Sequence, residues 1–133
     1  CRHNLIYWGH GEYAGIGPGA HSRLDEGGVR LALHTIDDPR NWSAGVAQHG
    51  HGIAGETRLT PFESAEEYVL MGLRHAAGID PARFARLASR PLDQQRIANL
   101  VAQGFLQHHP ASHVSATAKG RHVLNAITRE LLA

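Results

Sequence analysis

The sequence PFESAEEYVLMGLRHAAGID, residues 61–80, is the most regular segment of the chain and sets its fold class. Its apolar residues recur at the i, i+3, i+4, i+7 spacing that lines one face of an α-helix. They are Ala65, Tyr68, Val69, Gly72, Leu73 and Ala76. Proline suits the first turn of a helix and glycine suits the position after its end. The segment therefore predicts a helix that begins near Pro61, ends at Gly78 and buries one face.

Two further helices are predicted after this segment. Asp80-Pro81 and Asp93 are typical helix starts, because an aspartate side chain accepts hydrogen bonds from the unpaired N–H groups of the first turn. Gly104 marks the end of the second of these helices. The residues predicted to be buried are Phe84 and Leu87 in the first, and Ile97, Leu100 and Val101 in the second.

The last part of the chain predicts a hairpin followed by a helix. Residues 105–109 and 113–116 flank Pro110-Ala111-Ser112 and are predicted to form a two-stranded wing. Thr117 is predicted to cap a final helix, whose inner face carries Val123, Leu124, Ile127 and Leu131. Three helices, a hairpin and a final helix make a winged-helix-like order.

The first part of the chain predicts a small β element. Residues 13–16 are predicted to form a short strand that Gly17-Pro18 stops. Residues 21–24 and 29–33 are predicted to form two strands joined by Asp25-Glu26-Gly27-Gly28. The two glycines suit the positive φ angles of a tight hairpin turn.

A connecting helix completes this first part. It is predicted from Asp37-Asp38-Pro39 to about His49, with a break at Gly50-His51-Gly52. Together the patterns predict an α+β fold that is mainly α, with the small β element followed by a winged-helix-like C-terminal helical domain. We place the domain boundary between residues 1–60 and 61–133.

Composition narrows the class of protein. The chain has 133 residues, of which 42% are hydrophobic and 19% charged, so a compact domain with a modest core is expected and disorder is not. Its net charge of +1 does not favour nucleic acid or an anionic membrane as a partner. No apolar run approaches the roughly 20 residues that span a bilayer, and no signal-peptide pattern is present. We therefore expect a soluble protein.

Two stretches near the start carry candidate site residues. In His3-Asn4-Leu5-Ile6-Tyr7-Trp8, a histidine beside an aromatic pair could line a pocket for a planar ligand. In Gly15-Ile16-Gly17-Pro18-Gly19-Ala20-His21-Ser22, the glycines let backbone approach a ligand closely. Residue types alone leave both stretches open. A histidine beside aromatics is more often an ordinary core or surface residue, and the second stretch lacks the spacing of a dinucleotide or phosphate loop.

A resemblance to a known family gives these stretches a function. His3-Asn-x-x-Tyr-Trp8, followed by Tyr13-Ala-Gly-Ile-Gly-Pro-Gly-Ala-His-Ser22, resembles the junction after the catalytic barrel in radical S-adenosylmethionine proteins of the coproporphyrinogen oxidase-like group. The similarity is greatest to the heme chaperone branch of that group. Glu66–Asp80 and Thr117–Gly120 resemble the C-terminal domain of the same group. The chain thus resembles a C-terminal fragment, with the N-terminal barrel of the same protein as its missing partner.

The resemblance implies roles for individual residues. The heme-binding residues would be His3, Asn4, Tyr7 and Trp8, with His3 as the metal ligand on the heme iron. The wall of the S-adenosylmethionine cavity in the complete protein would include Gly15, Gly17, Gly19, His21 and Ser22. The family holds a 4Fe-4S cluster on a Cys-x-x-x-Cys-x-x-Cys loop. This chain has one cysteine, Cys1, so the fragment alone is not expected to contain catalytic residues or to be active.

Three function classes follow. The leading one is a heme chaperone, which binds heme and delivers it to acceptor proteins in the cytoplasm, with peripheral membrane association through those acceptors. The alternative is an oxygen-independent coproporphyrinogen III oxidase of porphyrin biosynthesis. A winged-helix contact with protein or nucleic acid ranks lowest, because the candidate recognition helix offers one cation, Arg96, and phosphate attraction dominates DNA affinity.

Two histidine groups and one sheet edge complete the candidates. His49-x-His51 and the wing residues His108, His109 and His113 could each suggest a metal site, but no cysteine or carboxylate lies near them in sequence. We expect a solvated loop and an exposed hairpin instead. The β element would pair with the end of the missing barrel, so its edge is a candidate surface for dimerisation.

Overall fold

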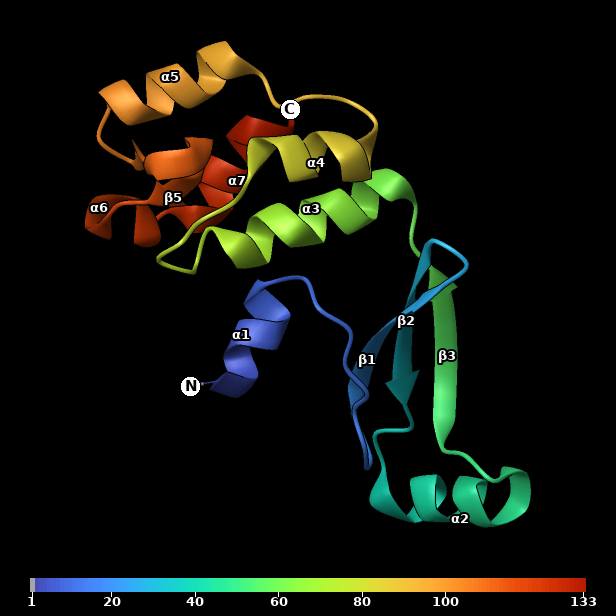
Figure 1. The fold of residues 1–133 in the computed structure, drawn as a ribbon. Helices are drawn as coiled ribbons and strands as arrows, with labels where there is room; N and C mark the ends of the chain where they lie inside the picture. Colours follow the sequence, from blue (N-terminus) through green and yellow to red (C-terminus); the bar gives the residue numbers. More distant parts are fainter. Residues whose placement is uncertain (1) are drawn as a thin grey trace. The chain divides into compact units, whose positions relative to one another are not determined.

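The computed structural model describes residues 2–133, and describes side chains from Asn4 onward (Figure 1). The chain divides into two compact units. The helical unit comprises the residues up to His10 together with Pro61–Ala133, and the sheet unit comprises Gly11–Thr60. The N-terminal segment therefore packs with the C-terminal part of the chain rather than with the residues that follow it.

The helical unit contains one hydrophobic core. Its elements are α1 (Arg2–Trp8), α3 (Pro61–Gly72), α4 (Pro81–Ala88), α5 (Gln94–Ala102), β4 (Leu106–His108), the 3-10 turn η1 (Pro110–Ser112), β5 (Val114–Ala116), α6 (Ala118–Arg121) and α7 (Leu124–Leu132). Its fully buried side chains come from helices, strands and the segment between α3 and α4, and include Val69, Leu73, Ile79, Phe84, Leu106 and Ile127. Removing this apolar surface from water is the main force that holds the unit together.

The sheet unit is a three-stranded antiparallel sheet with one helix. Its elements are β1 (His21–Glu26), β2 (Val29–Thr35), α2 (Pro39–His49) and β3 (Ile53–Arg58), in the sheet order β1-β2-β3. Gly27 and Gly28 form the turn between β1 and β2, with φ angles of 57° and 82°. Positive φ at both central residues is the requirement of a type I′ hairpin turn, as the sequence predicts.

The predicted helix caps are confirmed. Asp38 Oδ1 accepts a hydrogen bond from Asn41 N at 2.9 Å, and Asp80 Oδ1 accepts one from Ala82 N at 2.8 Å. Asp93 caps α5 in the same way, and the Thr117 hydroxyl accepts from Gly120 N at 3.1 Å. The predicted wing is also present, because β4 and β5 pair antiparallel across η1. The mainly α, α+β fold class is therefore confirmed.

Three details of the prediction are wrong. Residues 13–16 do not form a strand, because only Tyr13 makes an isolated bridge, to Arg23. The helix from Pro61 ends at Gly72 rather than Gly78, since the chain turns to pair Ile79 with Val114. The final helix is divided into α6 and α7 by His122 and Val123, and Val123 is 40% exposed rather than buried.

Two elements were not predicted. β3 carries mostly exposed residues, so it has no alternation of buried and exposed side chains that a sequence pattern could reveal. α1 is seven residues long and has no acidic residue in its first turn and no basic residue in its last. Among the described residues, no helix has the length and apolar character needed to cross a bilayer.

Candidate functional site

Helix α1 carries the stretch that the sequence singles out. Asn4, Tyr7 and Trp8 lie in this helix, and His3 is its second residue, although the His3 side chain lies outside the described residues. In an α-helix, positions 3 and 7 lie one turn apart on one side, as do positions 4 and 8. The helix thus brings the predicted heme-binding positions onto neighbouring faces of one short element.

Two large apolar side chains of α1 are exposed to solvent. Leu5 and Ile6 are each 45% exposed, while Tyr7 and Trp8 are half-buried and Asn4 is exposed. The Trp8 indole packs near the His75 imidazole, with ring centroids 5.9 Å apart. One face of α1 is therefore held against the residues after α3, and the helix leaves a small apolar surface uncovered within its unit.

A buried histidine, His10, lies two residues after the end of α1. His10 is 8% exposed, has a φ angle of 57° and closes the helix end through a hydrogen bond from its N–H to Tyr7 O at 3.1 Å. Its Nε2 lies 3.1 Å from Ser64 Oγ on α3. Its ring meets the Tyr68 ring edge-on, with centroids 5.9 Å apart. A polar side chain is thus buried with partners, as burial requires.

Tyr68 and Arg83 complete this group. Arg83 Nη1 donates to Gly9 O at 3.1 Å, and its guanidinium carbon lies 4.8 Å from the centre of the Tyr68 ring. The Tyr68 hydroxyl accepts a hydrogen bond from Asp80 N at 2.8 Å. We call His10, Ser64, Tyr68 and Arg83 the His10 cluster. It joins the end of α1 to α3 and α4.

The second predicted stretch lies in the sheet unit as a loop that leads into β1. Gly15 N donates to Ser22 Oγ at 2.9 Å, and Ser22 is 7% exposed. A Cβ on Gly15 would lie 2.3 Å from His21 O, so only glycine fits. Thr35 Oγ1 accepts from Ala20 N at 2.8 Å and donates to Gly17 O at 2.6 Å. The loop is thus held by Ser22 at its own end and by Thr35 on β2.

Only a few groups of this loop are open to solvent. Ile16 is 92% exposed, and Gly17 and Gly19 adopt positive φ angles of 101° and 66°. His21 is exposed on β1, with its ring centroid 6.4 Å from that of His34 on β2. The Ser22 hydroxyl is already engaged with Gly15, so His21 and the backbone near Ile16 are the groups that the loop offers to a ligand.

The predicted histidine groups do not assemble a metal site in the part of the chain that the structure describes, where no three His, Cys, Asp or Glu side chains converge. His49 and His51 lie with ring centroids 6.3 Å apart. In the wing, His109 Nε2 lies 2.7 Å from Ser115 Oγ, a residue that is 1% exposed. His109 therefore contributes a structural hydrogen bond.

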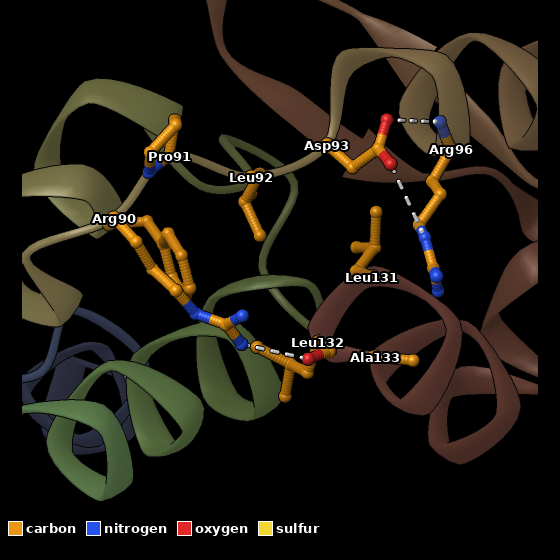
Figure 2. A pocket seen from close by; sticks show the side chains of 9 residues that line it. Arg90, Pro91, Leu92, Asp93, Arg96, Leu131, Leu132 and Ala133 are labelled. Carbon is orange, nitrogen blue, oxygen red and sulfur yellow. Dashed lines mark hydrogen bonds and ion pairs between the residues drawn. The ribbon is translucent and has the colours of Figure 1, made fainter.

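Figure 2 shows a small cavity between the segment after α4 and the end of α7. Its volume is about 160 Å³, below the roughly 300 Å³ at which small-molecule sites begin. Its cations are already paired: Arg90 Nη2 donates to Leu132 O at 2.9 Å, and Arg96 contacts Asp93 and donates to Glu130 O. The cavity is not a candidate site, and the one cation of α5 is partly neutralised within its own unit.

Comparison with known proteins gives the family. The family described as HemN C-terminal domain matches residues 59–123. The mouse protein named radical S-adenosyl methionine domain-containing protein 1, mitochondrial, is 42% identical over 114 residues, which is 78% of this chain and 26% of that protein. The heme chaperone HemW of Bacillus subtilis is 30% identical over 129 residues, 95% of this chain and 33% of HemW.

The chain belongs to the HemN-like family of radical S-adenosylmethionine proteins. It corresponds to the C-terminal part of these proteins and lies close to HemW. The solved structure titled coproporphyrinogen III oxidase (HemN) from Escherichia coli, a radical SAM enzyme, shares the fold, with a TM-score of 0.63 at 18% identity over 91% of this chain and 28% of that one. The chain spans about a quarter of the mouse protein and a third of the Bacillus subtilis protein. The family resemblance seen in the sequence is thus confirmed, while the roles of the individual site residues stay predictions.

The His10 cluster is the feature that sequence reasoning missed. The stripe on α3 predicts that Tyr68 is buried, and a buried tyrosine hydroxyl needs a hydrogen-bond partner. The need of the Tyr68 hydroxyl for a partner is the one sequence feature that indicates a polar cluster beside α3. Nothing in the spacing of His10 indicates that it reaches Ser64, 54 positions away.

Proposed function

We propose that this chain is the C-terminal part of a heme chaperone-like protein, and that α1 supplies its contact with heme. Heme is the cargo in this proposal. The observation that supports it most is that His3-Asn-x-x-Tyr-Trp8 folds as a helix whose Leu5 and Ile6 are each 45% exposed. The delivery of heme to acceptor proteins is part of the same proposal, and its parallel is the relative named heme chaperone HemW.

The chemistry of α1 suits a heme. Heme iron takes a neutral imidazole as an axial ligand, which is the role we propose for His3. The macrocycle is large and apolar, and exposed apolar side chains gain free energy when such a surface covers them. Leu5 and Ile6 supply that surface, and the half-buried rings of Tyr7 and Trp8 are proposed to pack beside the macrocycle. Asn4 is the proposed hydrogen-bond partner of the second ring nitrogen of His3, because such partners fix the ligand orientation.

The radical chemistry would belong to the complete protein. The single cysteine of this chain cannot hold a 4Fe-4S cluster, so the donor set of the chain does not fit that group. We propose that Gly15, Gly17, Gly19, His21 and Ser22 form part of the S-adenosylmethionine cavity wall. In that role Ser22 braces Gly15 from behind, and the backbone around Ile16 faces the cavity.

The test is a heme titration of the complete protein, followed by absorbance. His3→Ala should change the Soret band and weaken heme binding at least about tenfold, because an axial ligand is lost. His49→Ala is the matched control, since His49 is an exposed histidine in the sheet unit and should leave both measurements unchanged. An unchanged Soret band and affinity in His3→Ala would remove His3 as the ligand.

The alternative is an oxygen-independent coproporphyrinogen III oxidase, favoured by the fold shared with the HemN structure. In this case the complete protein, reconstituted with its cluster and supplied with S-adenosylmethionine and a reductant, would decarboxylate the propionates of coproporphyrinogen III. Product formation that depends on S-adenosylmethionine would reverse the ranking of the two functions. Its absence, together with His3-dependent heme binding, would support the chaperone.

A further inference from the structure

We propose that the His10 cluster is a positioning device that holds α1 on α3 and α4, so that residues 61–133 set the orientation in which α1 meets heme. The proposal rests on the function proposed above. His10 and Ser64 are the positioning residues in this proposal, and neither is a heme ligand. His10 is 8% exposed and its Nε2 is engaged with Ser64 Oγ at 3.1 Å.

The need for such a device follows from the length of α1. The helix has seven residues, and isolated helices shorter than about 12 residues are marginal in water. Its sequence supplies no charge at either end that would favour the helix dipole. The fold and the rotation of α1 must therefore come from contacts with the rest of the helical unit.

Those contacts are concentrated at one end. Three consecutive residues each touch a different part of the unit: Trp8 packs against His75, Gly9 O accepts from Arg83, and His10 contacts Ser64. The partners lie after α3, on α4 and on α3 respectively. Three contacts from separate elements fix both the tilt and the rotation of a helix, whereas one contact would leave it free to turn.

Tyr68 links these contacts to each other. Its ring lies edge-on to His10 and 4.8 Å from the Arg83 guanidinium carbon, while its hydroxyl accepts from Asp80 N at the start of α4. Loss of His10 would therefore loosen the end of α1 without removing the α3–α4 contact. A substitution at His10 can therefore test how α1 is held without breaking the packing of α3 on α4.

The orientation matters because successive helix residues point about 100° apart. Trp8 marks the held side of α1, and Ile6, two positions earlier and so on the far side of the helix, marks its exposed side. If α1 turned freely, position 3 would be presented to heme in many directions. Iron would then be coordinated in mixed ways, with weaker binding and more than one spin state.

The experiment uses the complete protein with three substitutions. His10→Ala removes the contact, His10→Gln places an amide group near the position of the Nε2 atom, and His109→Ala is the matched control. His109 also forms a histidine–serine pair in the helical unit, with Ser115 at 2.7 Å, but it lies in the wing. Heme affinity, the spin state of the iron by electron paramagnetic resonance, and amide hydrogen exchange of residues 4–9 without heme are measured for each.

His10→Ala should weaken heme binding about tenfold, the lower end of what supporting partners contribute to metal affinity, and should give a mixture of spin states. It should also speed the exchange of the α1 amides without heme. His10→Gln should reverse part of each of these changes, and His109→Ala should show none of them. Equal effects of His10→Ala and His109→Ala on α1 and heme would overturn the proposal, because general destabilisation would then explain them.

The two proposals fail in different ways. If His3→Ala binds heme like the unsubstituted protein, the proposed ligand is wrong, but amide exchange still tests whether His10 holds α1. If His3 is confirmed as the ligand and His10→Ala leaves α1 exchange and the spin state unchanged, the positioning role is wrong and the heme function stands.

Discussion

The loop at residues 15–22 and helix α1 carry the two sets of predicted site residues, and they are stabilised in opposite ways. The loop is held by hydrogen bonds within the sheet unit: Ser22 accepts from Gly15 N, and Thr35 on β2 donates to Gly17 O and accepts from Ala20 N. α1 is held by side chains from α3, α4 and the turn after α3.

Because of this difference, substitutions in the two segments should have different effects. In the loop, a sequence motif is satisfied by hydrogen bonds near it in the chain, so substitutions there should act first on folding. In α1, the motif residues are left partly exposed and the support comes from residues more than 50 positions away. Substitutions on its exposed face should act on binding with little effect on folding. Four predictions, in decreasing order of their effect on stability, test this contrast.

Gly15→Val should give the largest loss of stability. A Cβ at this position would lie 2.3 Å from His21 O, a backbone atom that cannot move without disturbing β1. We expect a loss of about 3 kcal/mol in the free energy of unfolding, at the upper end of the usual overpacking range. Chemical denaturation followed by circular dichroism measures it. Ala14→Val, at an exposed neighbour, is the control, and equal losses for both would contradict the predicted clash.

Ser22→Ala should have a smaller effect in the same loop. It leaves Gly15 N without the hydroxyl that accepts its hydrogen bond at 2.9 Å. A part-buried donor without a partner costs about 1–2 kcal/mol. The same denaturation measurement applies, with the exposed Ser43→Ala as control. A loss no greater than that of the control would mean that water replaces the hydroxyl, and that the loop is less closed than its hydrogen bonds indicate.

The sequence predicts the helix caps and the Gly27-Gly28 turn better than it predicts α1, for a physical reason. Asp38, Asp80, Asp93 and Thr117 act on N–H groups two or three positions away, so short-range chemistry determines where those helices begin. The Gly27-Gly28 turn is local in the same sense. The family resemblance, also carried by short motifs, is confirmed by the HemN C-terminal domain match.

The rest depends on long-range contacts. α1 was not predicted because its stability comes from His75, Ser64 and Arg83, none of which its own sequence can indicate. The helix from Pro61 was extended too far because the pairing of Ile79 with Val114 overrides a helical pattern. β3 was not recognised because its exposed residues carry no periodicity. The candidate site lies where such contacts dominate, and therefore its supporting residues could not be found from the sequence.

Arg83→Met should affect α1 more than the unit as a whole. It removes the hydrogen bond to Gly9 O at 3.1 Å and the contact with the Tyr68 ring, while keeping most of the aliphatic chain. We expect the free energy of unfolding of the unit to fall by about 0.5–1 kcal/mol, the usual net contribution of one hydrogen bond. Two quantities are measured in each variant: the hydrogen-exchange rate of the amides of residues 4–9, and the free energy of global unfolding by chemical denaturation.

Arg86→Met is the control for this experiment, because Arg86 lies on the same helix and its partner is Asp80 rather than Gly9. Arg83→Met should increase the exchange of α1 while Arg86→Met leaves it unchanged. If both variants behave alike, the carbonyl of Gly9 is not a support of α1, and the helix is held by Trp8 and His10 alone.

Ile6→Ser should change stability least and yet weaken heme binding. Ile6 is already 45% exposed, and substitutions at such surface positions usually change stability by about 0.5 kcal/mol or less. If a macrocycle covers this face, the variant loses the apolar area that heme would bury, at about 25 cal/mol per Å², which corresponds to a roughly three- to tenfold weaker Kd. Absorbance titration of the complete protein measures the Kd.

Ile53→Ser is the matched control, since Ile53 is 42% exposed but lies on β3 in the sheet unit. Weaker binding in Ile6→Ser alone, at unchanged stability, would identify the exposed face of α1 as a binding surface, because a structural role would instead lower the unfolding free energy. Equal binding by both variants would mean that the exposed face of α1 contacts something other than heme. The N-terminal part that the relatives carry is then the alternative partner of this face, and the α1 amides of residues 1–133 alone should exchange faster without heme than those of the complete protein.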